Sequence, residues 1–212
     1  MAKNLTAVAV APLPDEPPRR PWFSKLHWLA IGLAVGVIAF YAIPLFDSQT
    51  SIQWDAVDVH YSAQKYFSES LWKGHLPQWT PFVFSGFPFL ADPQTGAWYP
   101  LHWPFFLIGI SPRTIVWELA LHAFLALFGM FLLARRLEFE PPFAILAGVF
   151  YAAGGFFAGH SSHIGIFETA ALFPWLLWAA LAAVESESAM PVALAGLIGG
   201  LMMLAGHFQT AL

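Results

Sequence analysis

The sequence contains no cysteine and very few charged residues. Without cysteine, the chain cannot form disulfide bonds, use a thiolate nucleophile or bind a metal through cysteine ligands. Only 10% of its 212 residues are Asp, Glu, Lys or Arg, against roughly a quarter in an ordinary globular protein. Nine basic residues against thirteen acidic ones leave no basic patch of the kind that nucleic acid requires, so we expect no nucleic-acid partner. So few charges also cannot cover the surface of a water-soluble domain of this size.

What the sequence does contain is apolar: 58% of its residues are hydrophobic, and they include 10 Trp and 21 Phe. Aromatic rings of this kind suit the boundary between membrane and water. Because a hydrocarbon core of about 30 Å needs roughly 20 apolar residues of helix, apolar runs close to that length indicate membrane spans. The sequence predicts an all-α integral membrane protein with about five transmembrane helices, at residues 28–45, 115–134, 143–158, 169–184 and 189–206.

The basic residues predict the orientation in the membrane. Residues 1–26 are polar and rich in proline, which predicts a flexible cytoplasmic tail in front of one transmembrane domain, residues 27–212. An N-terminus in the cytoplasm puts the pair Arg135 and Arg136 on that side together with the basic residues of the tail, as the positive-inside rule favours. The long loop of residues 46–114 then lies on the outer side.

This loop of about 70 residues is longer than a connection needs, which is typical of a functional segment. Residues 55–74 predict an amphipathic helix with Trp54, Tyr61 and Trp72 on its apolar face, lying along the outer membrane surface. Residues 76–104 contain six prolines, which favour a series of turns. The apolar segment 98–110 is too short to cross the membrane, and we interpret it as interfacial or re-entrant.

An ordered series of short segments resembles a known family. In the outer loop the series consists of Asp58, Gly74–Trp79, Gly86–Pro88, Ala91–Gly96 and Tyr99–Pro100. It continues through His122–Leu125, Leu132–Leu137, Gly159–His163, Pro174–Trp175 and Leu204–His207 with Gln209. Taken together, over roughly residues 30–212, these segments resemble the bacterial YfhO-like membrane proteins, which are grouped with the GT-C superfamily of polyprenyl-phosphate-dependent glycosyltransferases.

The resemblance implies a GT-C-like fold in the bacterial inner membrane and an inverting transfer of a sugar from a polyprenyl-phosphate donor to a cell-envelope acceptor on the outer face. It implies that Asp58, in the first outer loop, acts as the base. The partners implied are the lipid-linked sugar donor and membrane lipids, and they can include other membrane proteins. Members of the family are longer, with ten or more spans. The alternative function is therefore a non-catalytic membrane subunit, or a truncated remnant with a structural or interaction role. A transporter is less favoured, because the spans contain few polar residues and no internal repeat.

The residues themselves give Asp58 a chemical rationale. Inverting transfer needs a carboxylate close to the acceptor hydroxyl, and a helix held at the membrane surface would supply one there. The simpler interpretation is a solvated charge beside Lys65, and Asp55, about one turn earlier, is the alternative carboxylate.

Seven further residues are candidates for contact with substrate. Asp92 and Gln94 lie in a turn, where Asp92 more often caps its own backbone. Histidines at span ends can contact phosphate or sugar, or simply reach water. His160, His163 and Glu168 could also bind a divalent metal, but their spacing is common by chance, so we expect no metal site and no cofactor. Arg113 either contacts a lipid phosphate or anchors its helix at the interface. The substrate-binding candidates are Asp92, Gln94, Arg113, His160, His163, Glu168 and His207.

Two ionisable residues lie one turn apart within the second span. We expect Glu118 to reach the outer interface with its side chain and His122 to hydrogen-bond across the helix bundle.

Overall fold

A computed structural model of the chain describes residues 24–47 and 52–212, and the described part is helical. Most of the predicted tail, residues 1–26, lies outside the described residues. Within them no strand forms, and Thr80 and Phe87 make one isolated antiparallel bridge. The α-helices are α1 (Lys25–Ala42), α2 (Ser62–Trp72), α3 (Trp103–Ile108), α4 (Pro112–Arg136), α5 (Pro141–Ala152), α6 (Gly155–Gly159), α7 (Ile164–Glu185), α8 (Ala189–Leu204) and α9 (Phe208–Ala211).

Four segments of the described chain are long and apolar enough to cross a membrane: Lys25–Leu45, Pro112–Arg136, Pro141–Gly159 and Ile164–Glu185. The sequence predicted about five. The fifth run forms α8, whose 16 residues fall short of the usual length of about 17–25. The helix ends at Leu204, and Gly206 soon after has a φ of +102°, a left-handed conformation that stops a helix.

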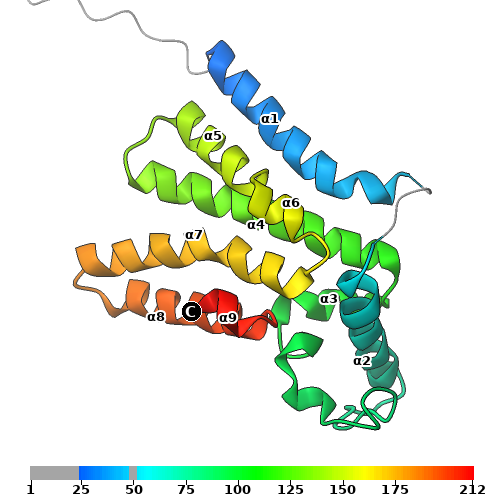
Figure 1. Cartoon of the computed structure of the whole chain (residues 1–212). Coiled ribbons are helices and arrows are strands. Elements are labelled where there is room, and N and C mark those ends of the chain that lie inside the picture. The colour runs from blue at the N-terminus through cyan, green and yellow to red at the C-terminus, as the bar shows by residue number, and fades with distance from the viewer. Residues whose placement is uncertain (1–23, 48–51) are drawn as a thin grey trace, which may run out of the picture.

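Helix α4 lies at the centre of the bundle and contacts α1, α5 and α7, while α8 packs against α7 (Figure 1). Glycines let these helices approach closely. The indole of Trp175 on α7 packs over Gly129 of α4 and donates a hydrogen bond to the Leu125 carbonyl at 2.8 Å. A Cβ atom added to Gly148 of α5 would lie 2.4 Å from the Leu127 carbonyl oxygen of α4. Small residues thus set the distance between α4 and its neighbours.

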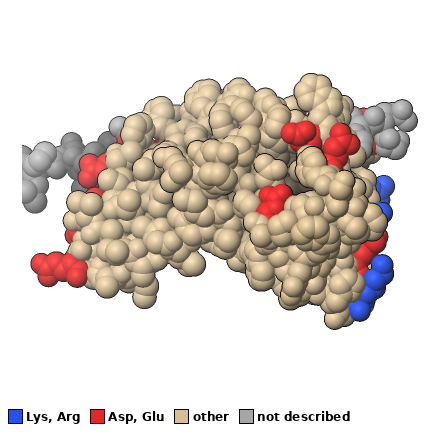
Figure 2. All heavy atoms as spheres, turned by 60° about the horizontal axis from the view of Figure 1, so that its bottom comes forward, with Lys and Arg blue, Asp and Glu red and all other residues tan. Residues whose placement is uncertain are grey.

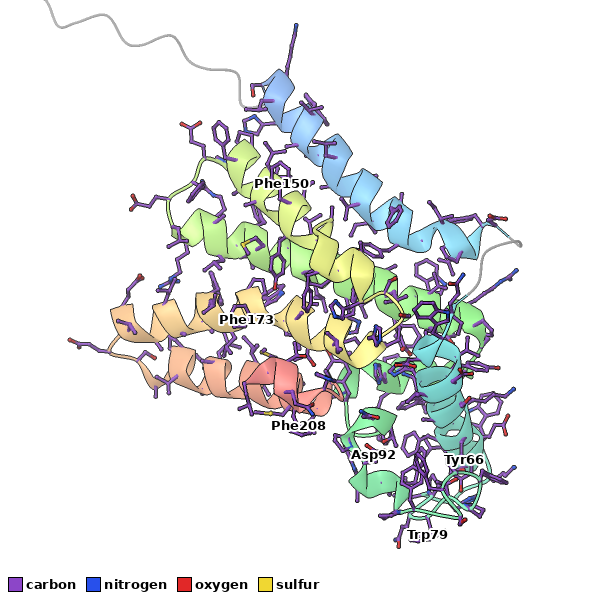
Figure 3. The ribbon with its side chains drawn as sticks, in the orientation of Figure 1. Tyr66, Trp79, Asp92, Phe150, Phe173 and Phe208 are labelled. Atoms are coloured by element: carbon purple, nitrogen blue, oxygen red, sulfur yellow. The ribbon has the colours of Figure 1, made fainter. Side chains whose placement is uncertain are left out.

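The surface of the bundle is apolar. Phe150, Phe173 and Phe208 are among the large hydrophobic side chains that stay exposed on its helices (Figure 3). Charged side chains gather towards the two ends of the face in Figure 2, with a broad uncharged surface between them. At one end Arg136 of α4 pairs with Glu185 of α7. This distribution is typical of a multi-pass membrane protein.

Residues 52–110 form a folded unit at the other end of the bundle, where α2 runs across the helix ends (Figure 1). Its aromatic core contains Phe67 from α2 together with Phe89 and Phe106, which come later in the loop. Ser68 of α2 donates a hydrogen bond to the Phe106 carbonyl at 2.7 Å. The loop is therefore packed by its own side chains.

The segment that contains α2 buries one face against the protein. His60, Gln64 and Phe67 are buried, whereas Trp54 and Trp72, from the predicted membrane-facing side, are exposed. Residues Ala56–Tyr61 form a π-helical segment, η2, directly before α2. Such a segment holds extra residues in its turn, so the side chains around it point in other directions than a regular α-helix predicts.

Replacing Gly148 by Ala tests the contact between α4 and α5. We expect G148A to lower the free energy of unfolding by about 1–3 kcal/mol, because the new methyl group meets backbone rather than a movable side chain. Denaturation in detergent measures the change. The control is G196A in α8, where a Cβ atom meets nothing within 4 Å and stability should not fall. Equal stability of the two variants would contradict this packing.

Candidate functional site

Two glutamates lie at the centre of the site, both fully buried. Glu118 is in the second turn of α4 and Glu168 is in the second turn of α7. Both helix starts adjoin the outer loop, and loop residues cover the carboxylates. The expectation that Glu118 reaches the interface is therefore wrong, because its solvent-exposed fraction is 0%.

His102 brings the loop onto both carboxylates. It ends a short 3₁₀ helix, η5 (Pro100–His102), and is fully buried. Its Nε2 atom lies 2.8 Å from Glu168 Oε1 and 3.7 Å from Glu118 Oε2, while its Nδ1 atom donates to the Gly96 carbonyl at 3.2 Å. Gly96 has a φ of +62°, and a Cβ atom there would lie 2.6 Å from His102 Nδ1. Glycine at this position thus allows the ring to sit against the backbone.

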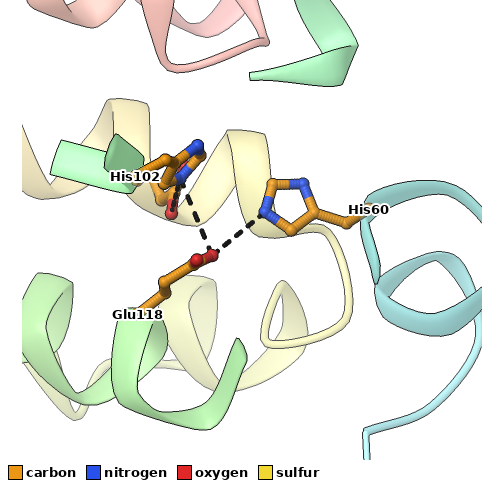
Figure 4. A group of neighbouring side chains, drawn as sticks. His60, His102 and Glu118 are labelled. Carbon is orange, nitrogen blue, oxygen red and sulfur yellow. Dashed lines mark hydrogen bonds and ion pairs between the residues drawn. The ribbon is translucent and has the colours of Figure 1, made fainter. Parts of the chain in front are cut away.

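His60 comes from another segment of the loop and also approaches Glu118 (Figure 4). Its Nε2 atom is 3.3 Å from Glu118 Oε2. The Gln64 amide, one turn later, donates to His60 Nε2 at 2.8 Å and to Glu118 Oε2 at 2.9 Å. Nε2 is thus the ring nitrogen of His60 that faces the cluster.

His122 supports the cluster from within α4. Its Nδ1 atom donates to the Glu118 backbone carbonyl at 2.7 Å and lies 3.5 Å from Glu168 Oε1. The buried Tyr99 hydroxyl is 2.9 Å from His122 Nε2 and donates to it, since Nδ1 carries the ring proton. His122 thus hydrogen-bonds to Tyr99 of the loop and also approaches Glu168 across the bundle.

The two carboxylates shift the pKa values of the groups around them. Burial lowers the pKa of His102, but the carboxylates of Glu168 and Glu118 raise it more, to about 9. Burial and the same carboxylates also raise the pKa of the Tyr99 hydroxyl. Three buried oxygens have no hydrogen-bond partner among the described residues: Glu118 Oε1, Glu168 Oε2 and Gln64 Oε1. Unsatisfied carboxylate oxygens inside a protein are costly, so the arrangement favours a cation.

Four residues of the cluster could hold a metal ion. His60, His102, Glu118 and Glu168 each offer one ligand atom, and these atoms all lie within 4.8 Å of one another. They come from two parts of the loop and two helices of the bundle.

A first cavity near the cluster is lined by three of the candidate residues predicted from the sequence. Asp58, Asp92 and Gln94 line a cavity of about 270 Å³ together with several aromatic side chains. Asp92 Oδ1 also accepts a hydrogen bond from the Gln94 backbone at 2.9 Å, which is the turn-capping role expected of it. Among the described residues, the Asp58 side chain makes no hydrogen bond or ion pair.

A second cavity, of about 170 Å³, lies next to the first and shares Gln94 with it. His163 and His207 line it, as does His60 from the buried cluster. His163 Nε2 lies 3.7 Å from the Asp55 carboxylate at its edge.

The remaining candidates lie elsewhere. His160 donates from Nδ1 to the Phe156 carbonyl at 2.7 Å, and Arg113 is exposed near the start of α4; neither lines the two cavities. Glu168 is buried against His102 rather than grouped with His160 and His163. Sequence reasoning missed His60 and His102 as members of a site. The signal that could have led to them was the ionisable pair in the second span, because such residues need partners inside the protein.

Replacing Tyr99 by Phe tests the hydrogen bond that supports His122. We expect Y99F to lower the free energy of unfolding by about 1–3 kcal/mol, because His122 Nε2 stays buried without a donor. Denaturation in detergent measures it. The control is Y61F, whose hydroxyl accepts a bond from Lys65 at the surface, with an expected change within about 0.5 kcal/mol. A Y99F protein as stable as Y61F would show that the bond does not form.

Comparison with known proteins adds no assignment: no family model matches the chain, and no match was found among curated proteins or solved structures.

Proposed function

We propose that this protein is a membrane glycosyltransferase that moves a sugar from a polyprenyl-phosphate donor to a cell-envelope acceptor. One observation carries the proposal: Asp58 and Asp92, distant in the sequence, line one cavity together with Gln94. The cavity is otherwise lined by aromatic side chains, among them Phe82 and Phe87, and such walls bind sugar rings and exclude water.

The place of this cavity suits a lipid-linked donor. It lies in the folded loop at one end of an apolar bundle, where a lipid head group meets protein. With the N-terminus in the cytoplasm, as the basic residues favour, this end faces the outer side of the bacterial inner membrane. Helix α2 would then lie along the membrane surface, and α8, despite its length, would complete the bundle of a GT-C-like domain.

Asp58 would act as the base in this reaction. Its carboxylate takes the proton of the acceptor hydroxyl while that oxygen attacks the anomeric carbon, and the lipid phosphate leaves with the electrons of the broken bond. An exposed carboxylate with no partner among the described residues is free to accept this proton. Asp92, held by its own turn, is placed to accept a hydrogen bond from a sugar hydroxyl.

The second cavity would receive the phosphate of the donor. His163 and His207 offer imidazole donors there, and Gln94 lines both cavities, so a sugar phosphate could extend from one to the other. Imidazole groups stabilise the negative charge that grows on the leaving phosphate.

Replacing Asp58 by Asn removes the proposed base. In membrane vesicles supplied with polyprenyl phosphates that carry labelled glucose, galactose or mannose, we expect D58N to slow transfer of the label by about 100-fold or more. The matched control is E69Q, an exposed carboxylate on α2 outside the cavity, which should transfer at the wild-type rate. Transfer by D58N at the rate of E69Q would exclude Asp58 as the base. If the wild type itself transfers no label from any of these donors, the result would favour a non-catalytic subunit.

Replacing His163 by Ala tests the phosphate position. We expect H163A to raise the KM for the lipid donor about tenfold, because one hydrogen bond to a charged group is lost. The change in kcat should be smaller. Initial rates over a range of donor concentrations measure both constants. H75A, an exposed histidine outside both cavities, serves as the control. An unchanged KM would mean that the phosphate binds elsewhere.

A further inference from the structure

The buried His/Glu cluster has the dimensions of a metal site. A tetrahedral ion with bonds of 2.0–2.1 Å holds its ligand atoms about 3.4 Å apart. The distances from His60 Nε2 and His102 Nε2 to Glu118 Oε2 are 3.3 and 3.7 Å, and that from His102 Nε2 to Glu168 Oε1 is 2.8 Å. Small side-chain adjustments would bring all four atoms onto one ion.

The charges of the cluster also call for a cation. Two carboxylates, Glu118 and Glu168, come together in it with no access to solvent. Glu118 Oε1 and Glu168 Oε2 are completely buried and lack a partner among the described residues. A divalent ion bound to one oxygen of each carboxylate would balance the charge of both glutamates.

The hydrogen bonds around the two histidines prepare Nε2 as the ligand atom. His102 donates from Nδ1 to the Gly96 carbonyl, which is the usual outer contact of a metal-binding histidine. His60 turns its Nε2 atom to the cluster, 3.3 Å from Glu118 Oε2. On binding a metal, His102 would release its Nε2 proton to solvent.

We infer that His60, His102, Glu118 and Glu168 bind one divalent transition-metal ion, for which Zn²⁺ fits the donor set. Two imidazoles favour such an ion over Mg²⁺ or Ca²⁺, which prefer oxygen ligands alone. The second cavity, which His60 lines, gives the ion a route from solvent.

The role that this geometry points to is structural. Four protein ligands close a tetrahedral site and leave no position for substrate. The ligands come from the η2 segment, η5, α4 and α7, so the ion would fasten the outer loop to the bundle. This inference does not depend on the transferase proposal.

Metal content measured on the full chain tests the inference. The protein, purified without a histidine tag, is stripped with a chelator and dialysed against Zn²⁺, and the bound zinc is measured by mass spectrometry. We expect about one equivalent of zinc in the wild type and in the control H75A, an exposed histidine that is not part of the cluster. E118Q and E168Q should bind zinc at least tenfold more weakly, because each loses a ligand.

A second measurement needs no variant. We expect Zn²⁺ at a free concentration 100-fold above its Kd to raise the Tm of the stripped wild type by about 5–10 °C, and a chelator to reverse the shift. Zinc in the stripped wild type with no rise in Tm, no zinc bound at all, or equal zinc in E168Q and wild type would each overturn the proposal.

Discussion

The burial of two carboxylates, Glu118 and Glu168, is the constraint on which the loop of residues 52–110 depends for its position. Each comes from a different helix of the bundle, and neither has access to solvent. Buried charges must be paired or neutralised, so side chains of the loop have to lie against these carboxylates as partners. His102 and His60, from two separate segments of the loop, contact the glutamates directly. Tyr99 hydrogen-bonds to His122, which lies beside them. The hydrogen bonds of the polar cluster thus fix one position of the loop on the bundle. Aromatic packing alone is less directional and would allow several positions.

The same arrangement places the two cavities. His60 belongs to the buried cluster and to the wall of the second cavity, and Gln94, in the turn just before Gly96, lines both cavities. Since the Gly96 carbonyl accepts the hydrogen bond from His102, the turn that carries Asp92 and Gln94 is tied to the cluster. The chemistry that we propose at Asp58 and the metal that we propose at the cluster are separate, but both need this turn held in place.

Much of the helical framework could be predicted from the sequence, because a long apolar run leaves few alternatives to a helix in a membrane. The prediction was less successful in local detail: α8 is shorter than a span, and the π-helical geometry of η2 was not predicted. The cluster itself was not predicted. Its members lie far apart in the chain, and no local spacing connects His60 or His102 to Glu118. Asp58, Asp92 and Gln94 were identified from local patterns and a resemblance, and their roles stay predictions.

In this structure the buried carboxylates hold the loop of residues 52–110 on the bundle. Hydrogen exchange of the backbone amides in the wild type and in E168Q tests it most directly, segment by segment. The account predicts that amides of residues 96–108 exchange faster in E168Q, because His102 loses its partner, while those of α5 keep their protection. Unchanged protection of residues 96–108 in a folded E168Q protein would contradict it.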